Sequence, residues 1–138
     1  MPAPDDIVTR IPYAAFLGIR IARDADGLLF QLPYAERLVG NRALPALHGG
    51  VVAGFMENAA LLHLMYLEPR QVGIPKTIDF SIDYLRSAGP RESLARCEVT
   101  RLGRRVAQVQ IRCWQENAAV PVAVARAHFL LGGQVPVA

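Results

Sequence analysis

The hydrophobic positions of this chain follow two periods, one typical of a helix and one typical of strands. The stretch GGVVAGFMENAALLHLMY, from Gly49 to Tyr66, contains no proline and carries apolar residues on nearly every helical face. A run of roughly 17 residues forms a helix of about 25 Å, and apolar residues on all faces indicate that other elements cover it. The pattern predicts one long buried helix that begins after a tight turn at Gly49 and Gly50.

Strand-like alternation dominates the remainder of the chain. It is clearest from Thr77 to Leu85, where one face is apolar and the other carries Thr77, Asp79, Ser81 and Asp83. Similar strand-like patterns predict further strands at residues 19–22, 28–33, 93–102, 106–115 and 120–131. A short helix is predicted at residues 11–17. Tight turns join most of these strands, so we expect a mostly antiparallel sheet.

The order of these elements predicts an α+β fold in a single domain spanning residues 1–138. About six strands would form one curved sheet that wraps the central helix, and a second copy of the chain would cover what the sheet leaves exposed. Residues 34–47 are expected to form an irregular loop before the helix, where binding residues are common. The two ends, 1–10 and 133–138, are expected to be loosely held.

Composition narrows the classes of partner. The chain has 138 residues, of which 52% are hydrophobic and 20% charged, and this suits one folded domain with a real core. The net charge is +3 and the 15 basic residues are scattered, so we do not expect nucleic acid as a partner. The long apolar helix carries Glu57, Asn58 and His63, so we do not expect a membrane either. Cys97 and Cys113 lack metal-like spacing, and we expect no signal peptide. These features predict a cytoplasmic protein with two free thiols.

One acidic residue, Glu57, lies inside the predicted helix. The residues one turn away from it are mostly small, namely Ala53, Gly54, Ala60 and Leu61. Glu57 either pairs with an arginine or caps a neighbouring element while its small neighbours allow close packing, or it faces a ligand cavity. In the second interpretation the N–H groups of Gly49, Gly50 and Val51 hold a carbonyl oxygen at the helix start, and burial keeps the Glu57 carboxylate weakly hydrated, which suits a base or nucleophile. An oxyanion site and a carboxylate together indicate acyl transfer.

The stretches LHGGVVAGFMENAA and TIDFSIDYLRSA are similar to the acyl-CoA thioesterases of the phenylacetate-degradation type, which have the hotdog fold. The first stretch matches that family's HGG turn followed by a carboxylate two turns into the helix. The second matches the strand that follows the helix and ends in a Tyr-Leu-Arg-like turn. The resemblance covers roughly residues 11–132 and implies one long central helix wrapped by a curved sheet.

The resemblance implies a role for each matching residue. Gly49, helped by Gly50, would offer the backbone N–H that polarises the thioester carbonyl, and Glu57 would act as general base or nucleophile. Thr77 stands where relatives have a Ser or Thr that holds the attacking water, and Asn41 stands near the family's Asn in the loop before HGG. In the family the site forms across a two-fold dimer interface, with the turn from one subunit and the acid from the other.

Two departures from the family pattern bear on these roles. Many relatives have Asp in place of Glu57, although a branch acting on hydroxybenzoyl-CoA has Glu, and the extra methylene moves the carboxylate by about 1 Å, enough to matter for catalysis. Asn41 lies seven residues before His48, one more than is common, and Pro45 interrupts the intervening loop. Arg42 could therefore take the place of Asn41, or neither residue acts.

Histidines and arginines near these motifs each have two interpretations. His48 either braces the turn through hydrogen bonds or is a base, as a histidine is in hotdog dehydratases. His63 and His128 share no ligand spacing with it, so we expect no metal. Four arginines at strand ends and a hairpin either bind the phosphates of coenzyme A or are solvated turn charges, namely Arg86, Arg101, Arg104 and Arg105.

Together these observations predict a thioester hydrolase acting on acyl-CoA, with coenzyme A as part of the substrate and no other cofactor. We expect a homodimer with shared active sites, or a tetramer made of two such dimers. An enoyl-thioester hydratase or dehydratase and a non-catalytic acyl-CoA-binding module are the alternatives. The sequence does not decide between aromatic and medium-chain acyl groups. The residues that could line an acyl pocket are Val51, Phe55, Met56, Leu61, Met65 and Tyr84.

Overall fold

The computed structural model of the chain describes residues 4–69 and 73–132. In chain order the elements are η1 (Pro4–Arg10), α1 (Pro12–Leu17), β1 (Arg20–Asp24), β2 (Gly27–Leu32), η2 (Glu36–Leu38), β3 (Val39–Asn41), β4 (Ala46–Leu47), α2 (Gly49–Leu67), β5 (Lys76–Tyr84), β6 (Ser93–Leu102), β7 (Val106–Trp114) and β8 (Ala123–Leu130). The long helix, the short helix and the six predicted strands are all present, with boundaries that differ by a few residues.

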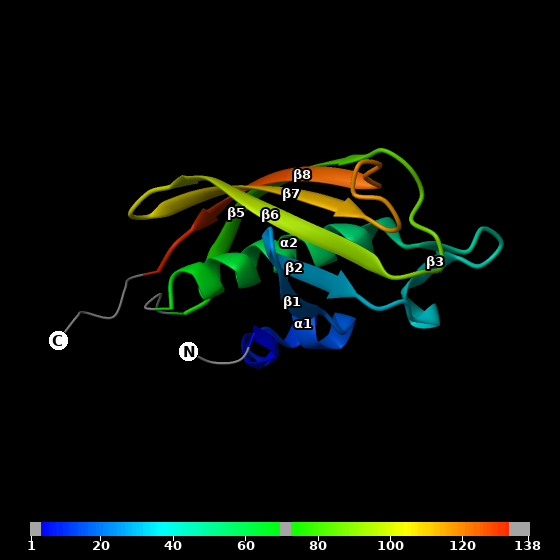
Figure 1. Cartoon of the computed structure of the whole chain (residues 1–138), viewed down its shortest axis with the longest axis horizontal. Coiled ribbons are helices and arrows are strands. Elements are labelled where there is room, and N and C mark those ends of the chain that lie inside the picture. The colour runs from blue at the N-terminus through cyan, green and yellow to red at the C-terminus, as the bar shows by residue number, and fades with distance from the viewer. Residues whose placement is uncertain (1–3, 70–72, 133–138) are drawn as a thin grey trace.

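Six strands form one antiparallel sheet in the order β1-β2-β6-β7-β8-β5. In Figure 1 the strands β5–β8 arch over α2, while α1 and η1 lie below it. The α+β class, the curved antiparallel sheet and the central helix predicted from the sequence are therefore confirmed. A separate two-stranded sheet joins β3 to β4 just before α2.

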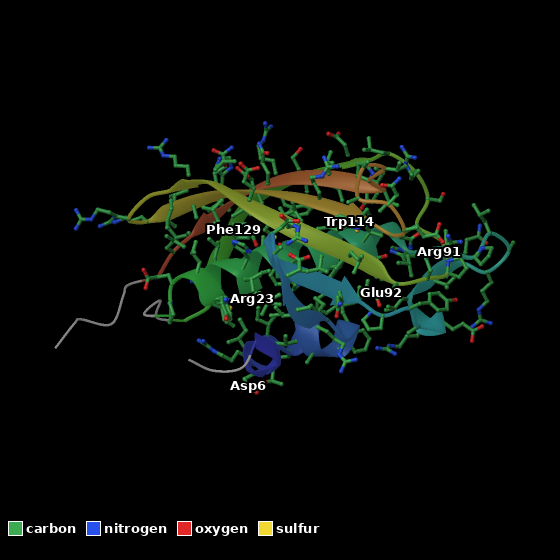
Figure 2. The ribbon with its side chains drawn as sticks, in the orientation of Figure 1. Asp6, Arg23, Arg91, Glu92, Trp114 and Phe129 are labelled. Carbon is green, nitrogen blue, oxygen red and sulfur yellow. The ribbon has the colours of Figure 1, made fainter. Side chains whose placement is uncertain are left out.

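The core lies between the concave face of the sheet and α2. Alternate residues of β7 and β8 point towards the helix and are buried, as period-two alternation requires. Phe129 on β8 has no exposed surface and lies between the sheet and α2 (Figure 2). By length and composition α2 could cross a membrane, but here the sheet, α1 and η1 pack against it as they would against the core helix of a globular domain.

Two segments differ from the expectation. Residues 4–10 were expected to belong to a loose end, yet they form η1, and its Ile7 and Val8 are each only 5% exposed. These two apolar side chains cover α2 and β1, which fixes the segment. Residues 34–47 were expected to be irregular, but they contain η2 and the β3–β4 sheet. The other predicted loose end, 133–138, lies outside the described residues.

The strand β5 forms one edge of the sheet and contains a bulge near its start. Its register with β8 shifts between Thr77 and Asp79, so that Thr77 lies opposite Phe129 and Asp79 lies opposite His128. Residues directly opposite each other on antiparallel strands share a face. Thr77 is therefore on the helix-facing side, and the expectation that it shares a face with Asp79 was wrong because the bulge inserts one residue.

Candidate functional site

The first turn of α2 uses most of its backbone donors internally. His48 is the N-cap residue, and its Nδ1 accepts a hydrogen bond of 2.9 Å from the N–H of Gly50. The His48 carbonyl accepts from the N–H groups of Val51, at 2.9 Å, and Val52, at 3.2 Å. Within residues 4–69 and 73–132 the N–H of Gly49 has no acceptor. The expectation of three free donors was wrong for Gly50 and Val51, because His48 already binds both, and it holds for Gly49.

The same bond determines the protonation of the His48 ring. Because Nδ1 accepts from an amide N–H, it carries no proton, and the neutral ring must carry its proton on Nε2. This is the arrangement of a ring that braces the turn. A side chain at Gly40, on the neighbouring strand β3, would lie 2.9 Å from the His48 Cα, so only glycine fits there. Sequence analysis did not single out Gly40, because it expected residues 34–47 to be irregular, whereas a glycine inside a short strand marks close backbone approach.

Tyr84, the last residue of β5, contacts the first residue of α2. Its hydroxyl donates a hydrogen bond of 2.7 Å to the carbonyl oxygen of Gly49. A Cβ on Gly49 would lie 3.4 Å from that hydroxyl, so the tyrosine covers the side-chain position that the glycine leaves empty. Gly49 and Tyr84 line a hollow of about 340 Å³ together with Leu47, Val52, Arg86 and others. The free N–H therefore lies beside an accessible pocket.

Hydrogen bonds fix the loop that carries Arg86. The carbonyl of Ala88 accepts from the N–H of Leu47 at 2.9 Å, which joins the loop to β4. The side-chain amide of Gln115 bonds both backbone groups of Gly89, at 2.9 and 3.0 Å. Arg91 pairs with Glu116 at 2.6 Å and lies at the same end of the molecule as β3 (Figure 2). Arg86 is thus presented to the pocket by an ordered loop.

Glu57 lies two turns along α2 and is half-buried. Its side chain has no hydrogen bond or ion pair within the described parts of the chain, so the structure does not support the interpretation in which it pairs with an arginine or caps a neighbouring element. Gly54, one turn earlier, is covered by the ring of Tyr13, since a Cβ there would lie 3.0 Å from it. The eight residues from Gly49 to Glu57 span about 12 Å along the helix axis. Within one protomer the free N–H and the carboxylate therefore cannot act on the same atom.

Asn41 and Arg42 do not reach the pocket at Gly49. The Oδ1 of Asn41 accepts from the N–H of Ala43 at 3.0 Å, which closes the turn between β3 and β4. Arg42 is exposed in that turn and makes no hydrogen bond or ion pair with the residues that the structure describes. Thr77 lies at the opposite end of β5 from Tyr84. In the protomer, these predicted site residues are not brought together with Gly49.

Two of the residues expected to line an acyl pocket belong to the core instead. Phe55 and Met56 have no exposed surface and pack among the buried core residues, so no ligand reaches them in the protomer. Both pack among the elements that cover α2, so their role in an acyl pocket stays a prediction. Leu61 is 8% exposed, while Val51 is half-buried at the edge of the core.

The predicted phosphate-binding arginines occupy two ends of the protomer. Arg104 and Arg105, with Arg101, line a groove of about 990 Å³ at the β6–β7 turn. Arg104 also lies beside the last turn of α2, whereas Arg86 lies beside its first residue. Figure 1 shows the β6–β7 turn and the start of α2 at opposite ends of the long axis. His128, in the same groove, pairs with Asp79 at 2.8 Å.

Buried titratable groups elsewhere are poor nucleophiles or bases. Burial raises the pKa of Cys113 to about 12, and it raises the pKa of Cys97 further, so neither thiol forms a thiolate at neutral pH. Burial also lowers the pKa of His63, whose Nδ1 has no hydrogen-bond partner among the described residues. Within residues 4–69 and 73–132 no three His, Cys, Asp or Glu side chains lie close enough to hold a metal ion.

The chain matches one protein-family model, described as the acyl-CoA thioesterase N-terminal domain, over residues 41–130. That range contains Asn41, His48, Gly49, Glu57 and Thr77. None of the curated proteins matches the chain.

Several solved structures resemble this one. A protein from Chromobacterium violaceum is 44% identical, with 93% of this chain and 95% of that chain covered and a TM-score of 0.70. A phenylacetic acid degradation-related protein from Ralstonia eutropha JMP134 is 22% identical, with coverages of 94% and 92% and a TM-score of 0.70. A protein from Bacillus halodurans, solved with CoA, is 17% identical, with coverages of 93% and 81% and a TM-score of 0.74. These likenesses, with the sheet wrapped around α2, identify the hotdog fold.

Proposed function

Because the chain belongs to the family of acyl-CoA thioesterase domains, as its HGG motif indicated, we propose that it hydrolyses the thioester of an acyl-CoA. The observation that supports this proposal best is the N–H of Gly49 at the start of α2, which has no acceptor among the described residues and belongs to a residue that lines a pocket. Hydrolysis of a thioester needs such a donor, because its carbonyl oxygen becomes an anion when the carbon is attacked.

Three features of the turn strengthen the Gly49 donor. The positive end of the α2 dipole lies at this N–H. The carbonyl of the same peptide group, that of His48, accepts two hydrogen bonds, and such bonds polarise an amide so that its N–H donates more strongly. The His48 ring occupies the neighbouring Gly50 N–H, so a carbonyl oxygen is directed to Gly49 alone.

Glu57 supplies the second half of the reaction. As a base it takes a proton from water, whose oxygen attacks the thioester carbon; the carbon–sulfur bond then breaks, and the coenzyme A thiolate takes up the proton. As a nucleophile it attacks the same carbon, releases the thiolate and leaves a mixed anhydride that water opens. Thr77, on the helix-facing side of β5, would help to hold the water. Coenzyme A enters as part of the substrate, and neither route needs another cofactor.

The Glu57 that acts with a given Gly49 belongs to a second copy of the chain. The two groups lie about 12 Å apart along one helix, but a two-fold axis can set one helix antiparallel to its partner. Residues 49 and 57 are equally far from residue 53, so an axis level with Ala53 places Gly49 of each copy opposite Glu57 of the other. Such a dimer has two equivalent sites.

The edge strand β5 is suited to carry that interface. It pairs only with β8 among the described strands, so its other edge presents free backbone groups. It also exposes apolar side chains, with Ile78 55% and Tyr84 53% exposed. A two-fold axis that joins this edge to itself makes the two strands antiparallel, and one continuous sheet results. A homodimer of this kind, or a pair of such dimers, is the proposed assembly.

Antiparallel pairing also bears on the arginines. It places the end of β5 in one copy, with Arg86, beside the start of β5 in the other, where the Arg104 and Arg105 groove begins. Guanidinium groups bind phosphate oxygens in a bidentate manner. We therefore assign the phosphates of coenzyme A to Arg86 of one copy and to Arg104 and Arg105 of its partner. A structural neighbour from Bacillus halodurans was solved with CoA, which agrees with such a ligand.

The function is tested by thiol release from a panel of aromatic and medium-chain acyl-CoA thioesters, with Glu57→Ala as the matched variant. We expect turnover of at least one substrate, and its loss in the variant. Single-turnover hydrolysis in labelled water separates the two routes, because label enters the Glu57 carboxylate only through the anhydride.

Other outcomes of that test point to other functions. Water addition to an enoyl-CoA with little thiol release would indicate a hydratase, a reading that His48 disfavours because its Nδ1 is occupied. Thermal stabilisation by coenzyme A without thiol release from any acyl chain would indicate a binding module.

A further inference from the structure

Tyr84 ties the edge strand of the sheet to the first residue of the central helix. Its hydroxyl donates to the Gly49 carbonyl at 2.7 Å, across 35 residues of sequence. The ring lies over the position where Gly49 lacks a side chain. The residue that carries the unpaired N–H is therefore in direct contact with the end of β5.

Neither partner needs this bond in order to be satisfied. Tyr84 is 53% exposed, so its hydroxyl could donate a hydrogen bond to water instead of to the Gly49 carbonyl. The Gly49 carbonyl belongs to the first turn of α2, where it accepts from the helix itself. Since the half-exposed ring is not a core residue, the main effect of the bond is to fix the position of Gly49.

The bond completes a clamp on one peptide group. The peptide between residues 49 and 50 consists of the Gly49 carbonyl and the Gly50 N–H. Tyr84 donates to the first, and Nδ1 of His48 accepts from the second. The preceding peptide is held through its own His48 carbonyl, which accepts from Val51 and Val52. Glycine has the widest backbone freedom of any residue, so without these contacts the Gly49 N–H could turn away from a ligand.

We propose that Tyr84 is a positioning residue that holds the Gly49 N–H in line with the thioester carbonyl. This inference rests on the proposed function. It assigns the tyrosine no contact with the reacting atoms, since it acts through the Gly49 peptide. It also links the site to assembly, because the strand that ends in Tyr84 is the edge at which a second copy docks and brings its Glu57.

The test compares Tyr84→Phe with Tyr66→Phe, which loses a hydroxyl that bonds Arg23 towards the other end of α2. Both variants keep the ring, and melting curves check that both fold. For Tyr84→Phe we expect kcat to fall by about 10- to 100-fold, since displacing a catalytic group by about 1 Å has an effect of this size. We expect KM to stay within about twofold, and Tyr66→Phe to match the wild type.

Two analogues of the substrate supply a readout that a purely structural role would not move. Water or the Glu57 carboxylate adds to the carbonyl carbon of a trifluoromethyl ketone analogue, and the tetrahedral adduct carries its former carbonyl oxygen at the oxyanion position. A thioether analogue has no carbonyl oxygen to hold. Because the Gly49 donor acts on the oxyanion, Tyr84→Phe should lower the affinity for the ketone analogue by the same factor as kcat. Its affinity for the thioether analogue should not change.

Three results would overturn the inference. If the wild type is active and Tyr84→Phe has the same kcat, Tyr84 has no positioning role, while the proposed function still stands. Equal weakening of both analogues would show that Tyr84 shapes the pocket rather than the donor. A wild type that releases no thiol from any substrate would contradict the proposed function, and with it this inference.

Discussion

Replacing Gly49 by proline deletes one hydrogen-bond donor and disturbs little else. Gly49 is the first residue of α2, the position at which proline is favoured in helices. The preceding residue, His48, has φ −59° and ψ 135°, the extended conformation that a residue before proline prefers. The N–H that the change removes has no acceptor in the parts of the chain that the structure describes. We therefore expect Gly49→Pro to fold normally.

The expected effect on catalysis is large and the expected effect on stability is small. Removal of one oxyanion donor costs about 10²- to 10³-fold in kcat, or roughly 2.7–4 kcal/mol of transition-state stabilisation. Proline also restricts the unfolded chain, which contributes roughly 0.4–1 kcal/mol to stability where the native conformation fits. Gly49→Pro should thus melt no lower than the wild type while losing almost all turnover.

Gly49→Ala is the matched control. It keeps the N–H and adds a methyl group that would lie 3.4 Å from the Tyr84 hydroxyl, an ordinary contact distance. We expect it to retain activity within about tenfold of the wild type, since the methyl group fits at that distance and the donor stays in place. The assay is release of free coenzyme A thiol under saturating substrate. A proline variant as active as the alanine variant would refute the reasoning, because the donor would then be dispensable.

Further expectations concern the turn and the titrating groups. Gly40→Ala would place a Cβ 2.9 Å from the His48 Cα, so we expect kcat to fall at least about tenfold in the thiol-release assay, and unchanged turnover would count against the bracing role of His48. Burial lowers the pKa of His63 below 6.5, so the unfolded chain takes up a proton at this histidine more readily than the folded one. The free energy of unfolding should therefore be unaffected by His63 above pH 6.5 and decline as the pH falls below it. In pH-dependent melting curves His63→Leu should lose that decline, and an unaltered profile would argue against it. The hydrogen bond from Arg96 holds the pKa of Asp24 below 3.8, so this carboxylate stabilises the fold above that pH and stops doing so as pH falls through its lowered pKa. The melting-temperature gap between wild type and Asp24→Asn should therefore close in strong acid, and a gap that persists there would contradict the assignment.

The sequence predicted the elements well because their patterns are local. The apolar run after Gly50 and the alternation in β5–β8 depend on residues close in the chain, and both match the structure. The segments that were mispredicted depend on distant partners. Ile7 and Val8 are ordered because α2 and β1 offer them an apolar surface. Thr77 changes face because of a bulge in its pairing with β8, which no residue of β5 announces.

For the site, sequence reasoning could name candidate residues but could not predict how they are arranged. Gly49 keeps its free N–H as expected, but the ring of His48 engages Gly50, a bond that depends on a particular rotamer. Tyr84 was singled out only as a possible wall of the acyl pocket, since its contact with Gly49 joins residues far apart in sequence. Phe55 and Met56 could not be assigned a direction, because α2 is apolar on every face.

The central claim is that Gly49 of one copy and Glu57 of another act on one carbonyl. Co-expression of Gly49→Pro and Glu57→Gln chains with different affinity tags allows mixed dimers to be isolated. In a shared-site dimer the two defects fall in the same site, so the other site is intact and mixed dimers should show about half of wild-type activity. Homodimers of either variant should be nearly inactive. Mixed dimers as inactive as both homodimers would contradict the claim, because each site would then lie within one chain.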